Sequence, residues 1–152
     1  MNWIELIERY VSDTEMRCRF FPPAAPADMG EVERIVRITL PAELRDLLAQ
    51  TNGVTLQEKE DGGEWETFQS LIWSTERILA GNHRFKQERS ERHPHDPEPS
   101  NSLLAFSEVG NGDLFAFHVG GDNSIVYWDH EDDTVRVAYP SLPAFIEGWR
   151  GE

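Results

Sequence analysis

The sequence has little cysteine and no long hydrophobic run, and each shortage excludes a class of protein. Its apolar runs, such as Leu103–Phe106 and Ile125–Trp128, are too short for a membrane-spanning helix, which needs roughly 20 apolar residues. Glu5 and Glu8 interrupt the first apolar stretch, so we expect no secretory signal. Because Cys18 has no second cysteine as a partner, we predict a buried free thiol and a reducing, cytoplasmic location.

Basic residues are also scarce. Among 152 residues, 14 Lys and Arg stand against 28 Asp and Glu, which gives a net charge of −14 at pH 7. The segment 93–135 carries nine acids and no Lys or Arg. This balance opposes binding to nucleic acid or to an anionic membrane surface, since both attract positive charge, and it is compatible with a basic protein partner. An acidic surface that only keeps the protein soluble is the alternative interpretation.

The motifs of common enzyme classes are missing as well. The sequence has no Gly-x-Ser-x-Gly nucleophile elbow and no His-Glu-x-x-His zinc motif. The Gly-rich segments 110–113 and 120–123 lead into predicted strands and have no Lys near them, so we interpret them as hairpin turns rather than phosphate-binding loops. We therefore predict a protein without enzymatic activity and without a cofactor.

Two groups of side chains nevertheless have the chemistry of metal ligands. One consists of Asp113, Asp129 and His130, and a small metal-dependent enzyme built on it is one hypothesis for the function. The other is a His-x-His pair followed by an Asp in the segment 93–96. Each group also has a structural interpretation as polar residues of a solvated turn or loop.

Hydrophobic periodicity predicts the order of the elements. Apolar residues recur at helical spacing in four segments, which predict helices. The first begins at Trp3, the second begins at Pro41 and ends at Asn52-Gly53, the third begins after Ser74 as its N-cap, and the fourth spans Leu142–Trp149. Period-two segments predict strands at 54–57, 64–72, 103–106, 114–119, 124–129 and 134–139. We expect the last four to form one antiparallel sheet, with the helices at 40–51 and 142–149 packed against it.

This order predicts an α+β fold, a meander of antiparallel strands packed against several helices. The length suits a single domain over residues 1–152. Segment 87–101 is dense in charge, His and Pro, and we predict that it is an exposed loop within that domain.

The turn and helix signals together resemble a known family. In chain order they are Leu40-Pro41 opening a helix, Asn52-Gly53, Gly112-Asp113 between two strands, the aromatic strand that ends in Trp128-Asp129-His130-Glu131, and a closing aromatic helix through Trp149. Their order and spacing resemble the Smi/Knr-type family of the SUKH superfamily, from about residue 40 to residue 149. The family takes part of its name from a yeast cell-wall-assembly regulator.

The resemblance implies an α+β fold without catalytic activity. Many bacterial members are regarded as immunity proteins that bind and neutralise toxins, often nucleases. Under this interpretation the shared residues are structural, and they are Leu40, Pro41, Asn52, Gly53, Gly112, Asp113, Trp128 and Trp149.

We therefore predict a binding protein, an immunity protein that blocks a basic toxin domain by its shape and its charge. We expect the partner-binding residues on three acidic turns: Glu60, Asp61 and Glu64 on the first, Asp122 on the second, and Asp129, Glu131, Asp132 and Asp133 on the third. A regulatory interaction module that is unrelated to toxins is the alternative, as the eukaryotic relatives suggest.

Overall fold

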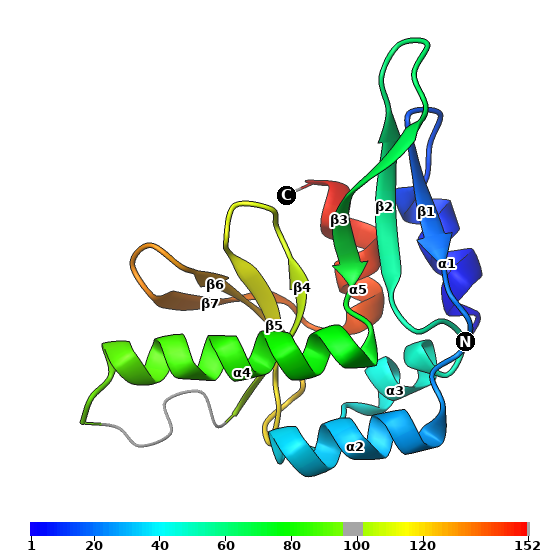
Figure 1. The fold of residues 1–152 in the computed structure, drawn as a ribbon. Coiled ribbons are helices and arrows are strands. Elements are labelled where there is room, and N and C mark those ends of the chain that lie inside the picture. The colour runs from blue at the N-terminus through cyan, green and yellow to red at the C-terminus, as the bar shows by residue number, and fades with distance from the viewer. Residues whose placement is uncertain (96–101, 152) are drawn as a thin grey trace.

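The computed structural model describes residues 1–95 and 102–151, and in these ranges the chain forms seven strands, five α-helices and a short 3-10 helix (Figure 1). The helices are α1 (Trp3–Val11), α2 (Pro26–Val36), α3 (Ala42–Leu48), α4 (Thr75–Arg92), α5 (Leu142–Gly148) and η1 (Trp149–Gly151). The strands are β1 (Met16–Phe20), β2 (Val54–Lys59), β3 (Trp65–Ile72), β4 (Leu103–Glu108), β5 (Leu114–His118), β6 (Ile125–Asp129) and β7 (Thr134–Tyr139).

The strands form two antiparallel sheets that lie side by side. The first has the order β1-β2-β3 and the second the order β4-β5-β6-β7. They meet where β3 lies beside β4: the backbone N–H of Trp73 donates to the carbonyl of Phe106 at 2.8 Å, and the side chain of Gln69 donates to the carbonyl of Glu108 at 2.8 Å.

This topology decides which turns share an end of the sheets. The tip of the β2–β3 hairpin, the β4–β5 turn and the β6–β7 turn are at the same end of the antiparallel strands. The hairpin tip projects upward in Figure 1, whereas the twist of the second sheet turns the β6–β7 turn sideways, toward the end of α4. The β5–β6 turn lies at the opposite end, because each strand of the meander reverses direction. We call the end with three turns the hairpin end.

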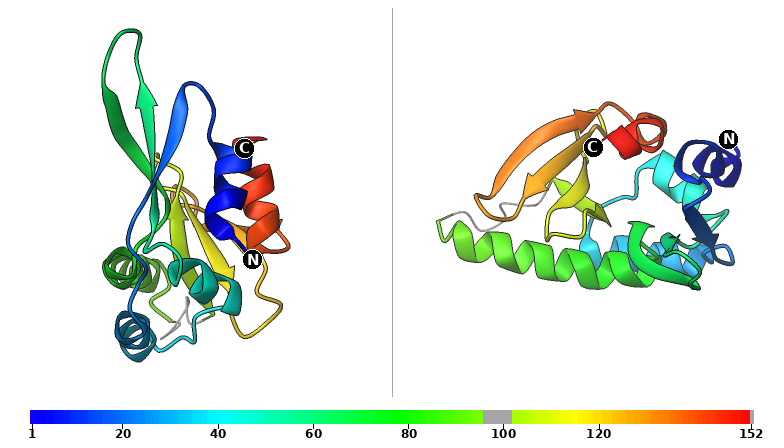
Figure 2. Two further views of the ribbon diagram at one scale, coloured as in Figure 1. Left: turned by 90° about the vertical axis from the view of Figure 1, so that its right-hand side faces the viewer. Right: turned by 90° about the horizontal axis from the view of Figure 1, so that it is seen from above.

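Helices cover the sheets unequally. On the second sheet, α4 packs against one face, where the rings of Phe85 and Trp128 meet edge to face at 5.0 Å between centroids. Helix α5 packs against the other face, where Phe145 lies 5.0 Å from Phe115. The first sheet has α1 and α5 on one face (Figures 1 and 2). No helix of the described residues covers its other face.

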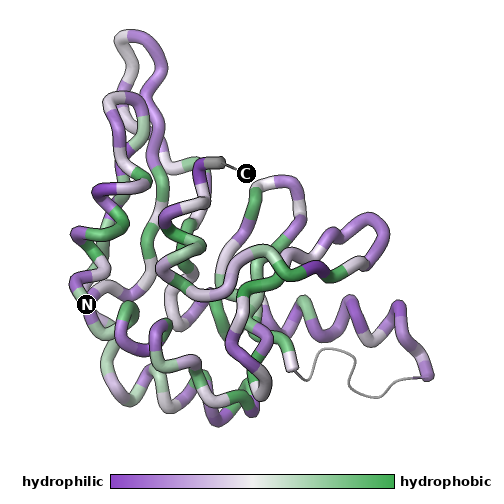
Figure 3. Tube along the Cα trace, turned by 180° about the vertical axis from the view of Figure 1, so that it is seen from behind, coloured by the Kyte–Doolittle hydropathy of each residue, from purple (hydrophilic) through white to green (hydrophobic). Residues whose placement is uncertain are grey.

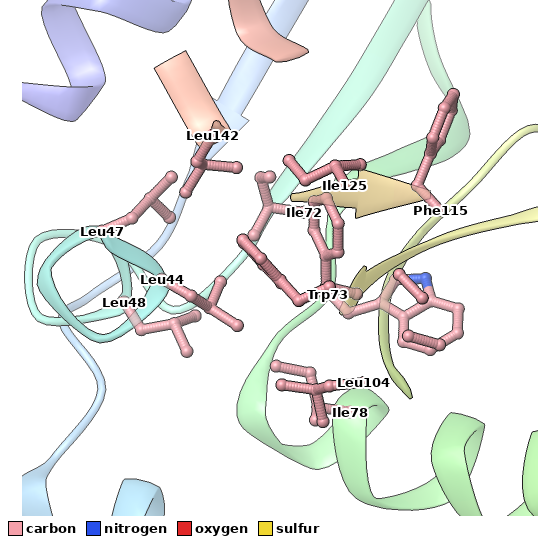
Figure 4. Packing of buried hydrophobic residues seen from close by; sticks show 14 of the residues in the cluster. Leu44, Leu47, Leu48, Ile72, Trp73, Ile78, Leu104, Phe115, Ile125 and Leu142 are labelled. Carbon is pink, nitrogen blue, oxygen red and sulfur yellow. The ribbon is translucent and has the colours of Figure 1, made fainter. Parts of the chain in front are cut away.

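The buried hydrophobic side chains form one cluster between these layers. Leucines 44, 47 and 48 of α3 lie close to Ile72, Ile125 and Leu142, which come from both sheets and from α5 (Figure 4). Hydrophobic residues run through the middle of the chain trace, whereas the β2–β3 tip and the β6–β7 turn are hydrophilic (Figure 3).

The structure confirms the α+β fold class and the antiparallel sheet predicted for residues 103–139. Helix α5 packs against this sheet as predicted, and the longest helix on it is α4. Strand β1 and helix α2 were not predicted from the sequence, and β1 adds a third strand to the sheet of the predicted strands at 54–57 and 64–72.

The loop predicted at 87–101 needs a correction, because α4 continues to Arg92. Its last turns are held by buried contacts: Arg89 is 8% exposed and pairs with Asp133. Residues 96–101 of the predicted loop lie outside the described residues.

Candidate protein-binding cleft

A cleft of about 610 Å³ opens at the hairpin end, between the two sheets. Met16 and Gln69 of the first sheet line one wall. Tyr127 and Arg136 of the second sheet line the other, and Trp149 lines the cleft where the chain leaves α5. The cleft therefore combines aromatic surface with a few polar groups, which is typical of a binding site.

Asp113, directly before β5, ties the β4–β5 turn to the β6–β7 turn. The residue is 5% exposed. Its carboxylate accepts hydrogen bonds from the backbone N–H of His130 at 3.0 Å, from Nδ1 of the same residue at 2.5 Å and from the Asn111 amide at 3.3 Å. It also accepts a hydrogen bond from the hydroxyl of Tyr127, whose ring lines the cleft. Asp113 thus fixes one wall of the cleft.

This network perturbs the protonation of its members. Burial by itself raises the pKa of Asp113, but the hydrogen bonds from Tyr127 and His130 outweigh it and lower the pKa to about 2. Burial, followed by the hydrogen bond to Asp113, raises the pKa of Tyr127 to about 12. The hydrogen bond to Asp113 raises the pKa of His130. A charged carboxylate therefore faces a neutral phenol and an imidazole whose protonated form is favoured.

The three residues predicted as possible metal ligands lie close together. Asp113, Asp129 and His130 each offer one ligand atom, and these atoms lie within 4.8 Å of one another. However, both oxygens of Asp113 already accept hydrogen bonds, and Nδ1 of His130 holds its proton toward Asp113. A metal ligand must present a deprotonated nitrogen. The contacts of this group are therefore those of an internal network.

The second predicted metal group is the His-x-His pair with the Asp that follows it. His93 contacts Asp133, His95 is exposed, and Asp96 lies outside the described residues.

Asp133, one of the predicted partner-binding residues, is turned inward. Its side chain is 10% exposed and accepts hydrogen bonds from Nε1 of Trp128 at 2.7 Å, from Arg89 at 3.1 Å and from the ring of His93 at 2.5 Å. These contacts anchor the β6–β7 turn to α4. They also remove Asp133 from the accessible acidic surface.

The other predicted acids divide between the two ends of the sheets. Six of them lie at the hairpin end, namely Glu60, Asp61 and Glu64 at the β2–β3 tip and Asp129, Glu131 and Asp132 at the β6–β7 turn. All six are exposed except Asp129, which is half-buried and lines the cleft. Asp122 is exposed in the β5–β6 turn, at the opposite end.

The hairpin carries two further acids that were not among the predicted partner-binding residues. Glu58 and Glu66 are directly opposite each other across β2 and β3, in the same register row as Met16. They therefore point to the same face as Met16, which lines the cleft. Side chains alternate between the two faces of the strands that flank the Asp61-Gly62-Gly63 turn, and this alternation could have predicted the position of both acids.

The predicted motif residues at 40–53 hold the connection between α3 and the first sheet. Leu40 is buried, and Pro41 is the N-cap residue of α3. The Asn52 side chain accepts a hydrogen bond from the backbone N–H of Thr75 at 2.8 Å, which fixes the start of α4. Gly53 has a φ of +93°, and a Cβ there would lie 2.8 Å from the backbone nitrogen of Ser74, so the position requires glycine.

One detail of that connection differs from the prediction. Helix α3 ends at Leu48 with Ala49 as its C-cap, so Asn52-Gly53 forms the turn into β2 instead of the end of the helix. Of the two motif tryptophans, Trp128 is fully buried and Trp149 is partly buried against the core.

Cys18 is half-buried on β1, and burial raises the pKa of its thiol. A raised pKa lowers the thiolate fraction, so the residue is poorly suited to act as a nucleophile.

In the parts of the chain that the structure describes, no helix is both long enough and apolar enough to cross a membrane. A comparison with protein families matches residues 23–148 to the SMI1 / KNR4 family (SUKH-1). A search of curated proteins finds no significant match. The matched residues run from the segment before α2 to the end of α5, so they include Gln69, Tyr127 and Arg136 of the cleft but not Met16 or Trp149. The match confirms the resemblance given by the motifs. The chain therefore belongs to the SMI1 / KNR4 family (SUKH-1).

Proposed function

We propose that this protein is an immunity protein, which neutralises a basic toxin domain by binding it at the hairpin end. The observation that carries the proposal is that two acidic turns, at the β2–β3 tip and between β6 and β7, lie at the end of the sheets where the aromatic cleft opens. Membership of the family supports a binding role.

Charge supplies the attraction. The β2–β3 tip and the β6–β7 turn together carry six accessible carboxylates, and Glu58 and Glu66 add two on the side of the cleft. A toxin that acts on nucleic acid needs a basic surface for its substrate. An acidic surface that occupies that basic surface excludes the substrate and accelerates association.

The cleft supplies the anchor. Trp149 lines the cleft beside Tyr127, on whose ring the guanidinium of Arg136 lies at 4.6 Å from the centroid. A few residues carry most of the energy in a protein interface, and Trp, Tyr and Arg are enriched among them. The network of Asp113 holds Tyr127 in place before binding, so little conformational freedom is lost on association. Occlusion of this kind requires no reacting group in the protein.

The experiment tests neutralisation in cells. The product of the gene beside this one is expressed in a sensitive host, alone and together with this chain. We expect growth arrest by the neighbouring product alone and recovery of growth with this chain.

Two variants with equal loss of charge make the test specific. The hairpin-end variant carries Glu60→Gln, Asp61→Asn, Glu64→Gln, Asp129→Asn, Glu131→Gln and Asp132→Asn. The remote variant changes six exposed acids on α1, on α2, at the start of α4 and at the opposite end of the second sheet, namely Glu5→Gln, Glu8→Gln, Asp28→Asn, Glu31→Gln, Glu76→Gln and Asp122→Asn. We expect the remote variant to protect the host and the hairpin-end variant to fail.

A neighbouring product that is harmless, or that both variants neutralise equally, would contradict the proposal. The first outcome would support the regulatory interaction module instead.

A further inference from the structure

The outer face of the first sheet, which no described helix covers, carries positive charge in an acidic protein (Figures 1 and 2). The register places Arg17, Gln57 and Thr67 in one row, and the next rows on the same face contain Arg19 and Thr55 on one side and Lys59 and Trp65 on the other. Side chains alternate between the two faces of a sheet. The acids Glu58 and Glu66 therefore point to the cleft, while the cations point outward.

These cations have no carboxylate partner among the described residues. Elsewhere arginines pair with acids, for example Arg34 with Glu31 at 2.7 Å and Arg77 with Glu108 at 2.9 Å. The contacts of Arg17, Arg19 and Lys59 are with aromatic rings and with a neutral amide. In a chain with twice as many acids as bases, three cations that share one face and have no ion pair with a described carboxylate leave their charge available to a ligand.

The cations are held in place by those contacts. The guanidinium of Arg17 lies 4.5 Å from the ring centroid of Trp65 and donates to the Gln57 amide at 2.7 Å. Lys59 lies 6.0 Å from the same centroid, and Arg19 lies 5.2 Å from the ring of Phe21. Side chains that are already ordered lose little entropy when they bind.

A groove of about 740 Å³ continues this face toward the start of α4. Phe21 and the two prolines after it line one side, and Thr55, Ser70 and Ile72 line its floor. Because Arg19 stacks on Phe21 and shares a register row with Thr55, the row of cations leads directly into the groove.

From this arrangement we infer that the outer face of the first sheet binds an extended acidic segment of a protein, whose carboxylates meet Arg17, Arg19 and Lys59 and whose apolar side chain enters the groove. Nucleic acid fits less well. The ring of Trp65 is already stacked by Arg17, so it offers no free platform for a base. This surface is separate from the hairpin-end cleft and has the opposite charge, so the inference does not rest on the proposed function.

The test is an NMR titration of the isotope-labelled full chain at low ionic strength. The probe is a short synthetic peptide in which Glu alternates with Leu, and the matched peptide has Gln in place of Glu. We expect saturable chemical-shift changes on β1, β2, β3 and the residues of the groove with the Glu peptide, and much weaker changes with the Gln peptide. Higher salt should weaken the binding of the Glu peptide, since the contacts are exposed ion pairs.

A matched pair of variants connects binding to the three cations. The triple change Arg17→Gln, Arg19→Gln and Lys59→Gln should weaken binding of the Glu peptide about tenfold, the effect of losing three exposed ion pairs. The control triple Arg9→Gln, Arg37→Gln and Arg84→Gln removes the same charge from other surfaces and should leave binding within about twofold.

Circular dichroism shows whether both variants are folded. Equal binding by both triple variants, equal binding of the Glu and Gln peptides, or tighter binding of an oligothymidylate than of the Glu peptide would overturn the inference.

Discussion

At the scale of single residues, Asp113 organises the hairpin end. It joins Asn111 of the β4–β5 turn, Tyr127 of β6 and His130 of the β6–β7 turn through one carboxylate. A side chain that receives several hydrogen bonds while nearly buried stabilises the fold only as long as all its partners are present.

Replacing Asp113 therefore tests its role in stability. We expect Asp113→Ala to lower the free energy of unfolding by about 2–4 kcal/mol, because it leaves polar groups without partners in a buried place. Urea denaturation followed by circular dichroism measures this change. Asp122→Ala, in an exposed turn, is the control and should change the free energy by roughly 0.5 kcal/mol or less. A folded Asp113→Ala protein of unchanged stability would contradict the role of the network.

The lowered pKa of Asp113 predicts a dependence of stability on pH. Because the pKa is about 2 in the folded protein and near 3.8 when unfolded, the charged network stabilises the fold above about pH 4, and this contribution is lost as the pH falls toward 2. We expect the stability difference between wild type and Asp113→Asn to shrink by about 2 kcal/mol between about pH 5 and pH 2. Urea titrations at several pH values measure it. A difference that stays constant over this range would show that Asp113 titrates normally.

The contribution of His130 to stability has the opposite dependence on pH. Its pKa is raised above 6.5 in the folded protein, so its stabilising contribution is complete below pH 6.5 and is lost as the pH rises through the higher folded value. An NMR titration of the imidazole protons measures the folded pKa directly. We expect Asp113→Asn to return it toward 6.5, because the hydrogen bond to Asp113 is the main cause of the increase.

At the scale of elements, α4 connects the two sheets. Its N-terminus is fixed by Asn52, its last turns by Asp133, and its middle by Asn82. The buried amide of Asn82 donates to the carbonyl of Ala105 at 2.9 Å and accepts from the N–H of Ala105 at 2.8 Å. A side chain therefore substitutes for a neighbouring strand at this point of β4.

We predict that Asn82→Leu destabilises the protein by about 2–4 kcal/mol. Leucine has a similar size but leaves the buried N–H and C=O of Ala105 without partners. Thermal and urea unfolding measure the loss. His83→Leu, on the exposed side of the same helix, should change the stability by roughly 0.5 kcal/mol or less, and equal effects of the two changes would refute the argument.

The elements also show what the sequence could and could not reveal. The C-terminal meander was predictable because its strands alternate in polarity and strong turn signals separate them. Strand β1 was missed although Met16, Cys18 and Phe20 alternate with two arginines, because so short a run needs β2 beside it to become a strand.

Two further features depend on contacts between distant residues. The last turns of α4 carry few apolar residues, and they are held by Arg89, whose partner Asp133 lies 44 residues away. Because the sequence does not reveal this contact, Asp133 was predicted to be an exposed acid. The acidic turns were visible as turns, but their division between the two ends became clear only from the pairing of β3 with β4.

At the scale of the whole molecule, acidic and basic side chains occupy different surfaces. Acids gather on the turns at the hairpin end, and Glu58 and Glu66 add to them on the cleft side of the first sheet. Its outer face carries cations that pair with no acid in the part of the chain that the structure describes. Two like charges directly across a strand pair lower the stability of a hairpin. The arrangement of charge therefore fits binding at the hairpin end better than it fits stability alone.

The central claim is that the acidic turns at the hairpin end attract a basic partner, and the rate of association tests it most directly. Stopped-flow measurements would use the purified neighbouring product in a catalytically inactive form and compare wild type, the hairpin-end variant and the remote variant. The salt concentration would vary so that the Debye length falls from about 30 Å to about 8 Å.

We predict fast, strongly salt-dependent association for wild type and for the remote variant. The hairpin-end variant should associate at least about tenfold more slowly at low salt, with a weaker dependence on salt. Equal rates and equal salt dependence for the two variants would contradict the claim, because both have lost the same charge and only its position differs.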